Sequence, residues 1–140
     1  MSFLSSMDAS ASGLTAQRLR MDIISENIAN VTTTRTGDGG PYRRKTVLFQ
    51  ERGEPFASSL ERAKSKGVKV TSVTEDRTPG MLVYEPEHPD ANADGYVLMP
   101  NVNIVREMTD MISASRSYEA NVTAMNLTKS MVAKTLEIGR

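Results

Sequence analysis

The chain has 140 residues, the size of one ordinary domain, and its 17 Lys and Arg side chains balance its 17 Asp and Glu side chains. The charges also balance within each third of the sequence, so no basic stripe is available for phosphate groups and a nucleic-acid-binding role is disfavoured. The sequence has no Cys and one His, which excludes disulfides and thiolate metal sites, and it has no apolar run of about 18 residues that could span a membrane.

The first 36 residues predict one helix followed by a loop. From Leu4 to Val31 the sequence has no Pro and a single Gly, Gly13, and its apolar side chains recur in steps of three and four. The two halves of this stripe differ in phase, so either the stripe drifts around the helix or the helix is interrupted near Gly13. After Asn30, the Thr- and Gly-rich stretch 32–41 predicts a loop.

The middle of the chain, residues 37–100, predicts short strands separated by turns. Alternating or β-prone residues bounded by Pro, Gly and Asp lie at 46–50, 68–71, 81–84 and 96–99. Ser, Lys and Glu dominate residues 55–66, so we expect a mobile loop there. The basic cluster of Arg43, Arg44 and Lys45 has no aromatic residues interleaved, which favours a solvated strand edge.

Residues 101–138 contain neither Pro nor Gly and predict a second, longer helix. A heptad stripe with steps of four and three runs along it, and all of its positions except Ser115 and Lys129 are apolar. The stripe consists of Ile104, Met108, Met111, Ser115, Tyr118, Val122, Met125, Lys129, Val132 and Leu136. Asn101 or Asn103 can cap the start of this helix and Gly139 its end. About 36 helical residues would form a rod of roughly 54 Å.

Together these elements predict an α+β fold in which the two terminal helices form a coiled-coil pair. The expected parts are an N-terminal helical segment, residues 1–36, a small β-rich region, residues 37–100, and a C-terminal helical segment, residues 101–140. A narrow stripe must be buried against another helix, and many other helix positions are small or uncharged, which permits close approach of neighbouring chains. We expect the helices to pair fully only within an assembly. The alternative is a monomeric helical hairpin packed on a small sheet.

Two motifs in residues 85–95 suggest chemistry but are incomplete. Residues 90–95 match the first half of a calcium-binding loop, yet Asn101 stands where a bidentate Glu is needed, and Pro86 and Pro89 break the helix that should come first. A turn in which Asn and Asp side chains bond their own backbone explains the same residues. His88 lies among carboxylates, but no Ser nucleophile on a Gly-rich turn accompanies it. We therefore expect no enzyme, with no catalytic residue, no metal site and no cofactor.

Several stretches of the sequence resemble one known family. Residues 11–22 (ASGLTAQRLRMD) and 27–30 (NIAN) resemble the N-terminal signature of the axial proteins of the bacterial flagellum, which form its rod and hook. Residues 41–45 (PYRRK) are similar to the segment that follows this signature in the proximal rod. Residues 88–97 (HPDANADGYV) and 100–103 (PNVN) resemble a motif that separates one rod protein from its relatives, and Glu107, Met108 and residues 117–121 also fit. The signature residues singled out are Asn27, Asn30, His88, Pro89, Asp90, Asp94, Gly95, Tyr96, Pro100 and Asn101.

The resemblance implies a structural subunit of the proximal rod of the flagellar basal body, polymerised through its terminal helices into a hollow drive shaft that transmits torque. The helices would form an inner coiled-coil layer around a channel, and the β-rich region would face outward. Residues expected to pack the helices or carry assembly are Leu4, Met7, Leu14, Met21, Ile24, Ile28, Ile104, Met108, Met111, Tyr118, Val122, Met125, Val132 and Leu136. Asn27 and Asn30 are expected to shape the exit of the first helix, where Asn tolerates left-handed backbone geometry.

The resemblance also implies the partners and the location of the chain. The partners would be copies of itself, other rod proteins including the distal rod, the protein that joins the rod to the membrane ring, and the flagellar type III export apparatus, with no nucleic acid and no membrane span. The subunit would be made in the cytoplasm, exported without a cleaved signal and built into a rod that spans the periplasm. A soluble coiled-coil adaptor or a secreted type III effector would share the helices, but neither explains the resemblance of residues 88–103.

Overall fold

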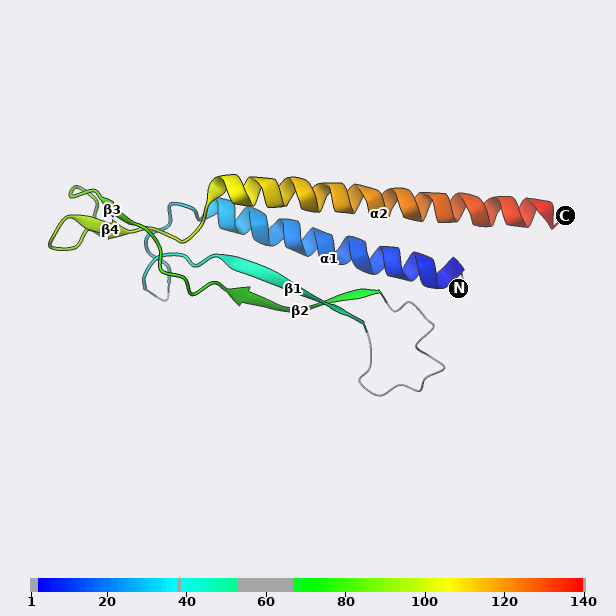
Figure 1. Ribbon diagram of the computed structural model, residues 1–140, viewed down its shortest axis with the longest axis horizontal. Coiled ribbons are helices and arrows are strands. Elements are labelled where there is room, and N and C mark those ends of the chain that lie inside the picture. Colours follow the sequence, from blue (N-terminus) through cyan, green and yellow to red (C-terminus); the bar gives the residue numbers. More distant parts are fainter. Residues whose placement is uncertain (1–2, 38, 53–66, 140) are drawn as a thin grey trace.

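The structure is a computed structural model that describes residues 3–37, 39–52 and 67–139, and the molecule is elongated (Figure 1). Helix α1 (Phe3–Ala29) has 27 residues and helix α2 (Ile104–Ile138) has 35. The two helices lie side by side and antiparallel, so both chain termini are at the same end of the molecule. The predicted α+β fold with two long terminal helices is confirmed, and the predicted loop at residues 55–66 lies outside the described residues.

The described residues also form four strands, at the places where the sequence predicts them. Strands β1 (Lys45–Glu51) and β2 (Val68–Glu75) form an antiparallel hairpin along the side of α1 that faces away from α2. Strands β3 (Leu82–Tyr84) and β4 (Tyr96–Leu98) form a second antiparallel pair at the end of the molecule opposite the termini. Helix α1 is therefore the middle layer, and α2 packs against α1 but against neither strand of the first hairpin.

Helix α1 runs through Gly13 without interruption. A methyl group built on Gly13 would lie 3.1 Å from Asn121 Nδ2, so the two helices approach closely at this point. The apolar stripe changes phase near Gly13 because α1 is covered on two sides, by α2 and by the β1–β2 hairpin, and each side needs its own apolar positions.

The face of α2 that packs on α1 differs from the predicted stripe at alternate positions. The buried and half-buried residues that follow steps of four and three are Glu107, Met111, Ala114, Tyr118, Asn121, Met125, Thr128 and Val132. This seam keeps four of the ten positions of the predicted stripe, replaces four others by the residue one position earlier, and does not include Ile104 or Leu136. Three of these earlier residues are polar and the fourth is Ala114, so a pattern of large apolar residues does not predict them.

The ends of α2 follow from its sequence. The side chain of Asn103 accepts a hydrogen bond from the Arg106 N–H at 3.1 Å, so Asn103 is the N-cap, and Gly139 is the C-cap. Of the two predicted caps, Asn101 therefore has a different role. The C-terminal end of α2 extends beyond the start of α1 (Figure 1).

The hydrophobic core is thin for a chain of this size. Among the described residues, the buried hydrophobic side chains are Ala16, Ile24, Tyr42, Val97 and Ala114, whereas many larger apolar side chains on α2 and the strands are exposed. Exposed apolar surface of this extent is typical of proteins that cover it with a partner. Neither of the described helices combines the length and the apolar character needed to cross a membrane.

Candidate functional site

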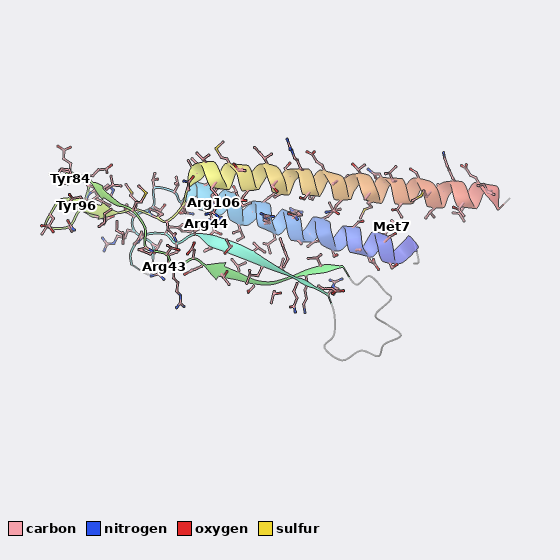
Figure 2. The ribbon with its side chains drawn as sticks, viewed as in Figure 1. Met7, Arg43, Arg44, Tyr84, Tyr96 and Arg106 are labelled. Carbon is pink, nitrogen blue, oxygen red and sulfur yellow. The ribbon has the colours of Figure 1, made fainter. Side chains whose placement is uncertain are left out.

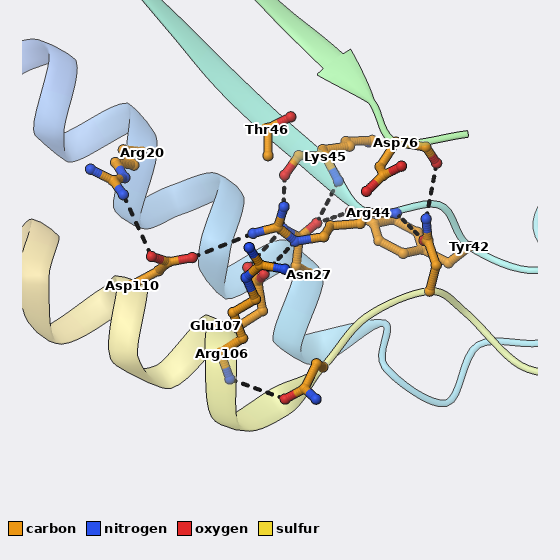
Figure 3. A network of polar contacts seen from close by, with 12 residues as sticks. Arg20, Asn27, Tyr42, Arg44, Lys45, Thr46, Asp76, Arg106, Glu107 and Asp110 are labelled. Carbon is orange, nitrogen blue, oxygen red and sulfur yellow. Dashed lines mark hydrogen bonds and ion pairs between the residues drawn. The ribbon is translucent and has the colours of Figure 1, made fainter. Parts of the chain in front are cut away.

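A network of polar contacts joins the end of α1, the start of β1 and the first turns of α2 (Figure 3). Asn27, which is 1% exposed, lies at its centre. Its Nδ2 donates to the Lys45 carbonyl and to Glu107 Oε2, both at 2.9 Å, and its Oδ1 accepts from the Tyr42 hydroxyl at 3.0 Å and the Lys45 N–H at 2.9 Å. The buried amide thus makes all four hydrogen bonds that it can form. Any other side chain at this position would leave buried groups unpaired.

The carboxylate of Glu107 is fully buried and is compensated within the same network. It accepts a hydrogen bond from Arg44 Nε at 2.6 Å in addition to the one from Asn27. The guanidinium of Arg44 also lies 3.4 Å from Asp110, and Asp110 lies 3.7 Å from Arg20 of α1. An isolated buried carboxylate would be very unfavourable, so these alternating charges hold β1 and both helices in one relative position.

Tyr42 and Lys45 extend the network towards the end of α1. Burial, together with the nearby carboxylates of Glu26, Glu107 and Glu75, raises the pKa of Tyr42 to about 12. The hydroxyl of Tyr42 therefore stays protonated and donates to Asn27 across the neutral pH range. Lys45 Nζ bonds Glu26 Oε1 at 2.6 Å and lies 5.5 Å from the centre of the Tyr42 ring.

The basic cluster at residues 43–45 is therefore not simply a solvated strand edge. Arg43 is exposed, as expected, but the side chain of Arg44 is only 16% exposed and that of Lys45 is 30% exposed. The prediction is wrong for these two residues because their ion-pair partners, Glu107 and Glu26, come from the two helices and cannot be found in the local sequence.

Asn101 connects the segment before α2 to the same region. Its Oδ1 accepts from the Arg44 N–H at 2.8 Å, and its Nδ2 donates to the carbonyls of Asp76 and Thr78, both at 3.0 Å. The Thr78 hydroxyl and N–H donate in turn to the Asp76 carboxylate, and these bonds lower the pKa of Asp76. One amide therefore fastens the end of β2 and the start of β1 to the entry of α2.

The turn between β3 and β4 is shaped by its own polar side chains. His88 Nδ1 accepts from the Asp90 N–H at 3.1 Å, and Asn92 Oδ1 accepts from the N–H groups of Asp94 at 3.0 Å and Tyr96 at 2.9 Å. The predicted turn, in which side chains bond the neighbouring backbone, is confirmed.

The same turn is attached to the Thr-rich loop that follows α1. Asp90 Oδ2 accepts from the Thr34 hydroxyl at 2.8 Å, and its other oxygen lies 3.8 Å from the guanidinium of Arg35. Gly95 has a φ of +78°, and a methyl group there would lie 2.9 Å from Tyr84 Cε2, so only Gly fits without a shift. The stretch 88–97 therefore serves as a rigid structural turn.

Comparison with known proteins identifies the family. Residues 7–35 match the family described as "Flagella basal body rod protein", and residues 93–138 match "Flagellar basal body rod FlgEFG protein C-terminal". The chain is 54% identical to flagellar basal-body rod protein FlgC of Bacillus subtilis, over 96% of this chain and 97% of that protein. It is 49% identical to FlgC of Borreliella burgdorferi over 99% and 98%, and 45% identical to FlgC of Salmonella typhimurium over the full length of both. The chain belongs to the FlgC family.

In this FlgC-family chain, Asn30 lies at the exit of α1 as expected, whereas Asn27 has a different role, and neither residue has left-handed backbone geometry. No described residue other than Gly has a positive φ, so the left-handed geometry expected at Asn27 and Asn30 is absent. Asn27 lies inside α1 and forms the centre of the polar network. Asn30 Nδ2 donates to the Glu26 carbonyl at 2.9 Å and its Oδ1 accepts from the Thr33 hydroxyl at 3.1 Å, so this side chain closes the last turn of α1.

The network also contains residues to which the sequence assigns no role in a site: Arg20 and Asp110, and also Tyr42 and Arg44, which the sequence indicates only as part of the segment 41–45. The sequence indicates Glu107 only through the family resemblance. One signal could have revealed it: Glu107 lies seven residues before Ala114, so it occupies a core position of the seam, where a carboxylate requires a specific partner.

The predicted packing residues divide into a covered set and an exposed set. Covered or half-covered residues are Met7, Leu14, Met21, Ile24, Ile28, Met111, Tyr118, Val122, Met125 and Val132. Exposed residues are Ile104 at 45%, Met108 at 56% and Leu136 at 71%. Nothing is described for the side chain of Leu4.

The exposed set is part of a larger apolar surface. Ile104, Val105, Met108 and Ile112, all between 45% and 69% exposed, form an apolar patch that we call the outer face of α2. Among the described helices and strands, only α1 packs against α2, and Figure 2 shows side chains projecting from the side of α2 that faces away from α1.

Proposed function

We propose that this chain is a structural subunit of the proximal rod, polymerised through its terminal helices into the shaft that transmits torque. The observation that carries this proposal is the match to FlgC proteins over nearly the whole chain, both ends included. The thin core and the exposed outer face of α2 support it, because they leave apolar surface that neighbouring subunits would cover.

The two helical segments, residues 1–36 and 101–140, would form the inner layer around a hollow channel, with residues 37–100 facing outward. The layering of the single subunit supports this division, since the β1–β2 hairpin lies on the side of α1 opposite α2. Contacts between subunits would then involve the outer face of α2, including Ile104 and Met108, and we also assign the exposed Leu136 to these contacts.

The polar network would act as the joint between the helical layer and the outer part. Torque applied to the outer part must reach the helices without rotating one against the other. A buried, fully hydrogen-bonded joint resists such rotation better than an apolar contact, because its bonds are directional. Asn27 of α1, Arg44 immediately before β1 and Glu107 of α2 supply these directional contacts.

The proposed setting is the basal body, with the rod crossing the periplasm. Partners would be copies of this chain, other rod proteins including the distal rod, the protein that joins the rod to the membrane ring, and the flagellar type III export apparatus that delivers the uncleaved chain. The absence of Cys supports this setting, since a chain without thiols cannot form wrong disulfides in an oxidising compartment.

A soluble coiled-coil adaptor or a secreted effector is not favoured by any observation. The relatives named above are basal-body rod proteins, and they match this chain from end to end. An enzymatic role is not proposed, because the polar groups gathered in the network are bonded to each other and serve packing.

The test is an in-frame deletion of the gene followed by complementation. The deletion should remove rod and hook while the membrane ring remains, and the wild-type gene should restore both. Met108→Glu, which places a charge on the outer face, should yield a folded subunit that does not restore the rod, whereas the neighbouring exposed change Thr109→Glu should restore it. Intact basal bodies in the deletion strain, seen by electron microscopy, would refute the proposal.

A further inference from the structure

The β1–β2 hairpin is a sheet of two strands, so each strand has an outer edge that no other described strand covers. The contacts with α1 show which backbone groups point to these outer edges. Asn27 bonds both the N–H and the carbonyl of Lys45 at 2.9 Å, so these two groups point away from β2. The Val68 N–H donates to Ser12 Oγ at 3.0 Å, so it points away from β1.

The remaining outward groups follow from the strand register. Backbone groups in an antiparallel pair point alternately toward the partner strand and away from it, and the bulge after Leu48 keeps the two strands in step. The outward-pointing residues are therefore Lys45, Val47, Phe49 and Glu51 on β1 and their register partners Glu75, Val73, Val70 and Val68 on β2.

Helix α1 covers only part of each outer edge. The two strands cross in the view of Figure 1, so α1 lies beside β1 at Lys45 and beside β2 at Val68. Outward backbone groups that have no hydrogen-bond partner among the described residues are those of Val47 and Phe49 on β1 and of Val70 and Val73 on β2. Each strand therefore presents a free stretch of edge to its surroundings.

Neither free edge carries the residues that usually protect an exposed strand. Residues 46–50 of β1 and 70–74 of β2 contain no charged residue and no Pro, which are the common means of preventing strand addition. Leu48, Phe49 and Val73 are 51%, 38% and 43% exposed. Uncharged edges with exposed apolar side chains are suited to binding a further strand.

A cleft of about 250 Å³ lies along the edge of β1. Val47 and Phe49 line it from the strand, and Ile23 and Ile24 line it from α1. A strand added to β1 would therefore find apolar side chains against which to pack, in addition to the free backbone groups.

We propose that β1 of one subunit pairs with β2 of a second copy of this chain, so that the hairpins of neighbouring subunits form one antiparallel sheet. In the register that the hairpin itself uses, the free stretches of the two edges meet, with Val47 opposite Val73 of the neighbour. The same register sets Glu51 near Lys69 of the neighbour, and both side chains are exposed. The two edges thus match in length, in backbone groups and in charge.

This pairing keeps all copies pointing in one direction, because β1 and β2 run in opposite directions within each hairpin. Neighbouring subunits then lie side by side around a common axis, since a contact between two different edges repeats from one copy to the next. Pairing two β1 edges or two β2 edges would invert one copy, which a shaft of uniformly oriented subunits does not allow. The contact rests on the proposed function and deepens it, since it defines how subunits meet sideways.

Cysteine cross-linking in the assembled rod tests the contact, because the natural chain has no Cys. In the proposed register Leu48 lies opposite Ser72 of the neighbour, within the distance that a disulfide spans. Leu48→Cys and tagged Ser72→Cys are expressed together in cells that lack the natural gene, and isolated basal bodies are oxidised. We expect at least about tenfold more mixed dimer than when Thr123→Cys, which is exposed on α2, replaces Leu48→Cys.

The outcomes separate the contact from the proposed function. Basal bodies that contain both variants but give mixed dimer only at the level of the control overturn the contact and leave the rod function standing. A dominant dimer between two Leu48→Cys chains overturns it equally. A wrong rod function would instead give intact basal bodies that contain neither variant.

Loss of one outward N–H provides an independent test. Val73→Pro removes an N–H that points away from β1, so the hairpin keeps its own hydrogen bonds and circular dichroism should show a folded chain. This variant should not build rods, whereas Val73→Thr, which keeps the N–H, should build them. A folded Val73→Pro chain that builds rods overturns the contact.

A charge exchange tests the register without altering the backbone. Glu51→Lys in the Leu48→Cys chain should lower the yield of mixed dimer about threefold, a typical effect of an exposed charge pair, and Lys69→Glu in the Ser72→Cys chain should restore it. A yield that the exchange leaves unchanged overturns the proposed register.

Discussion

The strongest test of the polar network is removal of the Arg44 side chain. In Arg44→Ala, the fully buried carboxylate of Glu107 would lose its 2.6 Å partner and keep only the amide of Asn27. Asp110 would retain Arg20 and suffer less. Breaking a buried ion pair from one side costs about 3–5 kcal/mol, a large part of the roughly 5–15 kcal/mol that stabilises an ordinary domain. Arg43→Ala, one residue earlier and exposed, should cost at most about 0.5 kcal/mol.

Urea unfolding followed by circular dichroism at the helix band measures both changes. With an ordinary denaturant slope, the midpoint of Arg44→Ala should fall by about 2–3 M relative to that of Arg43→Ala. The double variant Arg44→Met with Glu107→Leu should recover much of the loss, because it removes the buried charge together with its partner. Equal midpoints for the two single Arg variants would show that the buried pair does not hold the layers together.

Three further predictions concern other parts of the fold. Because its pKa is raised, Tyr42 makes its full contribution to the free energy of unfolding below pH 10, and this contribution is lost as the pH rises from 10 to about 12, where only the unfolded chain ionises. Tyr42→Phe should therefore reduce the fall of the urea midpoint between pH 10 and 12. A fall as steep as that of the wild type would contradict the assignment. Gly95→Ala should destabilise by about 1–3 kcal/mol and alter the Tyr signal in near-ultraviolet circular dichroism, whereas Gly37→Ala, with open space around it, should do neither. Asn103→Ala should cost about 1 kcal/mol in urea unfolding by removing the N-cap of α2, and a neutral result would mean that the cap is replaced by solvent.

The sequence predicts the elements of this fold well because each has a local cause. The steps of three and four place both helices, and alternation bounded by Gly and Pro places the four strands. The seam of α2 shows where this reasoning stops. The apolar pattern predicts Met108 and Val122 at the centre of the seam, whereas the structure has Glu107, Ala114 and Asn121 there. The backbones of the two helices approach closely at Gly13, which favours small or polar residues opposite it on α2.

The candidate site could not be assembled from the sequence for a related reason. Asn27 and Glu107 are 80 positions apart along the chain, and Arg44 and Glu107 are 63 apart. No periodicity links such pairs. The family resemblance pointed to Asn27 and Asn101 as residues of interest, but their roles follow only from which backbone and side-chain groups the fold places around them.

The position of α1 between α2 and the β1–β2 hairpin sets an order of events for a chain that is synthesised from its N-terminus. Helix α1 emerges first, but Asn27 in α1 bonds Glu107 in α2, which emerges last. The native surroundings of α1 therefore exist only when nearly the whole chain has emerged. Until then α1 is a lone segment whose stability depends on packing that has not yet formed. Bringing such distant segments together is slow compared with forming local turns. The native tertiary structure therefore cannot form until α2 has emerged, and the chain stays unfolded or partly folded until then.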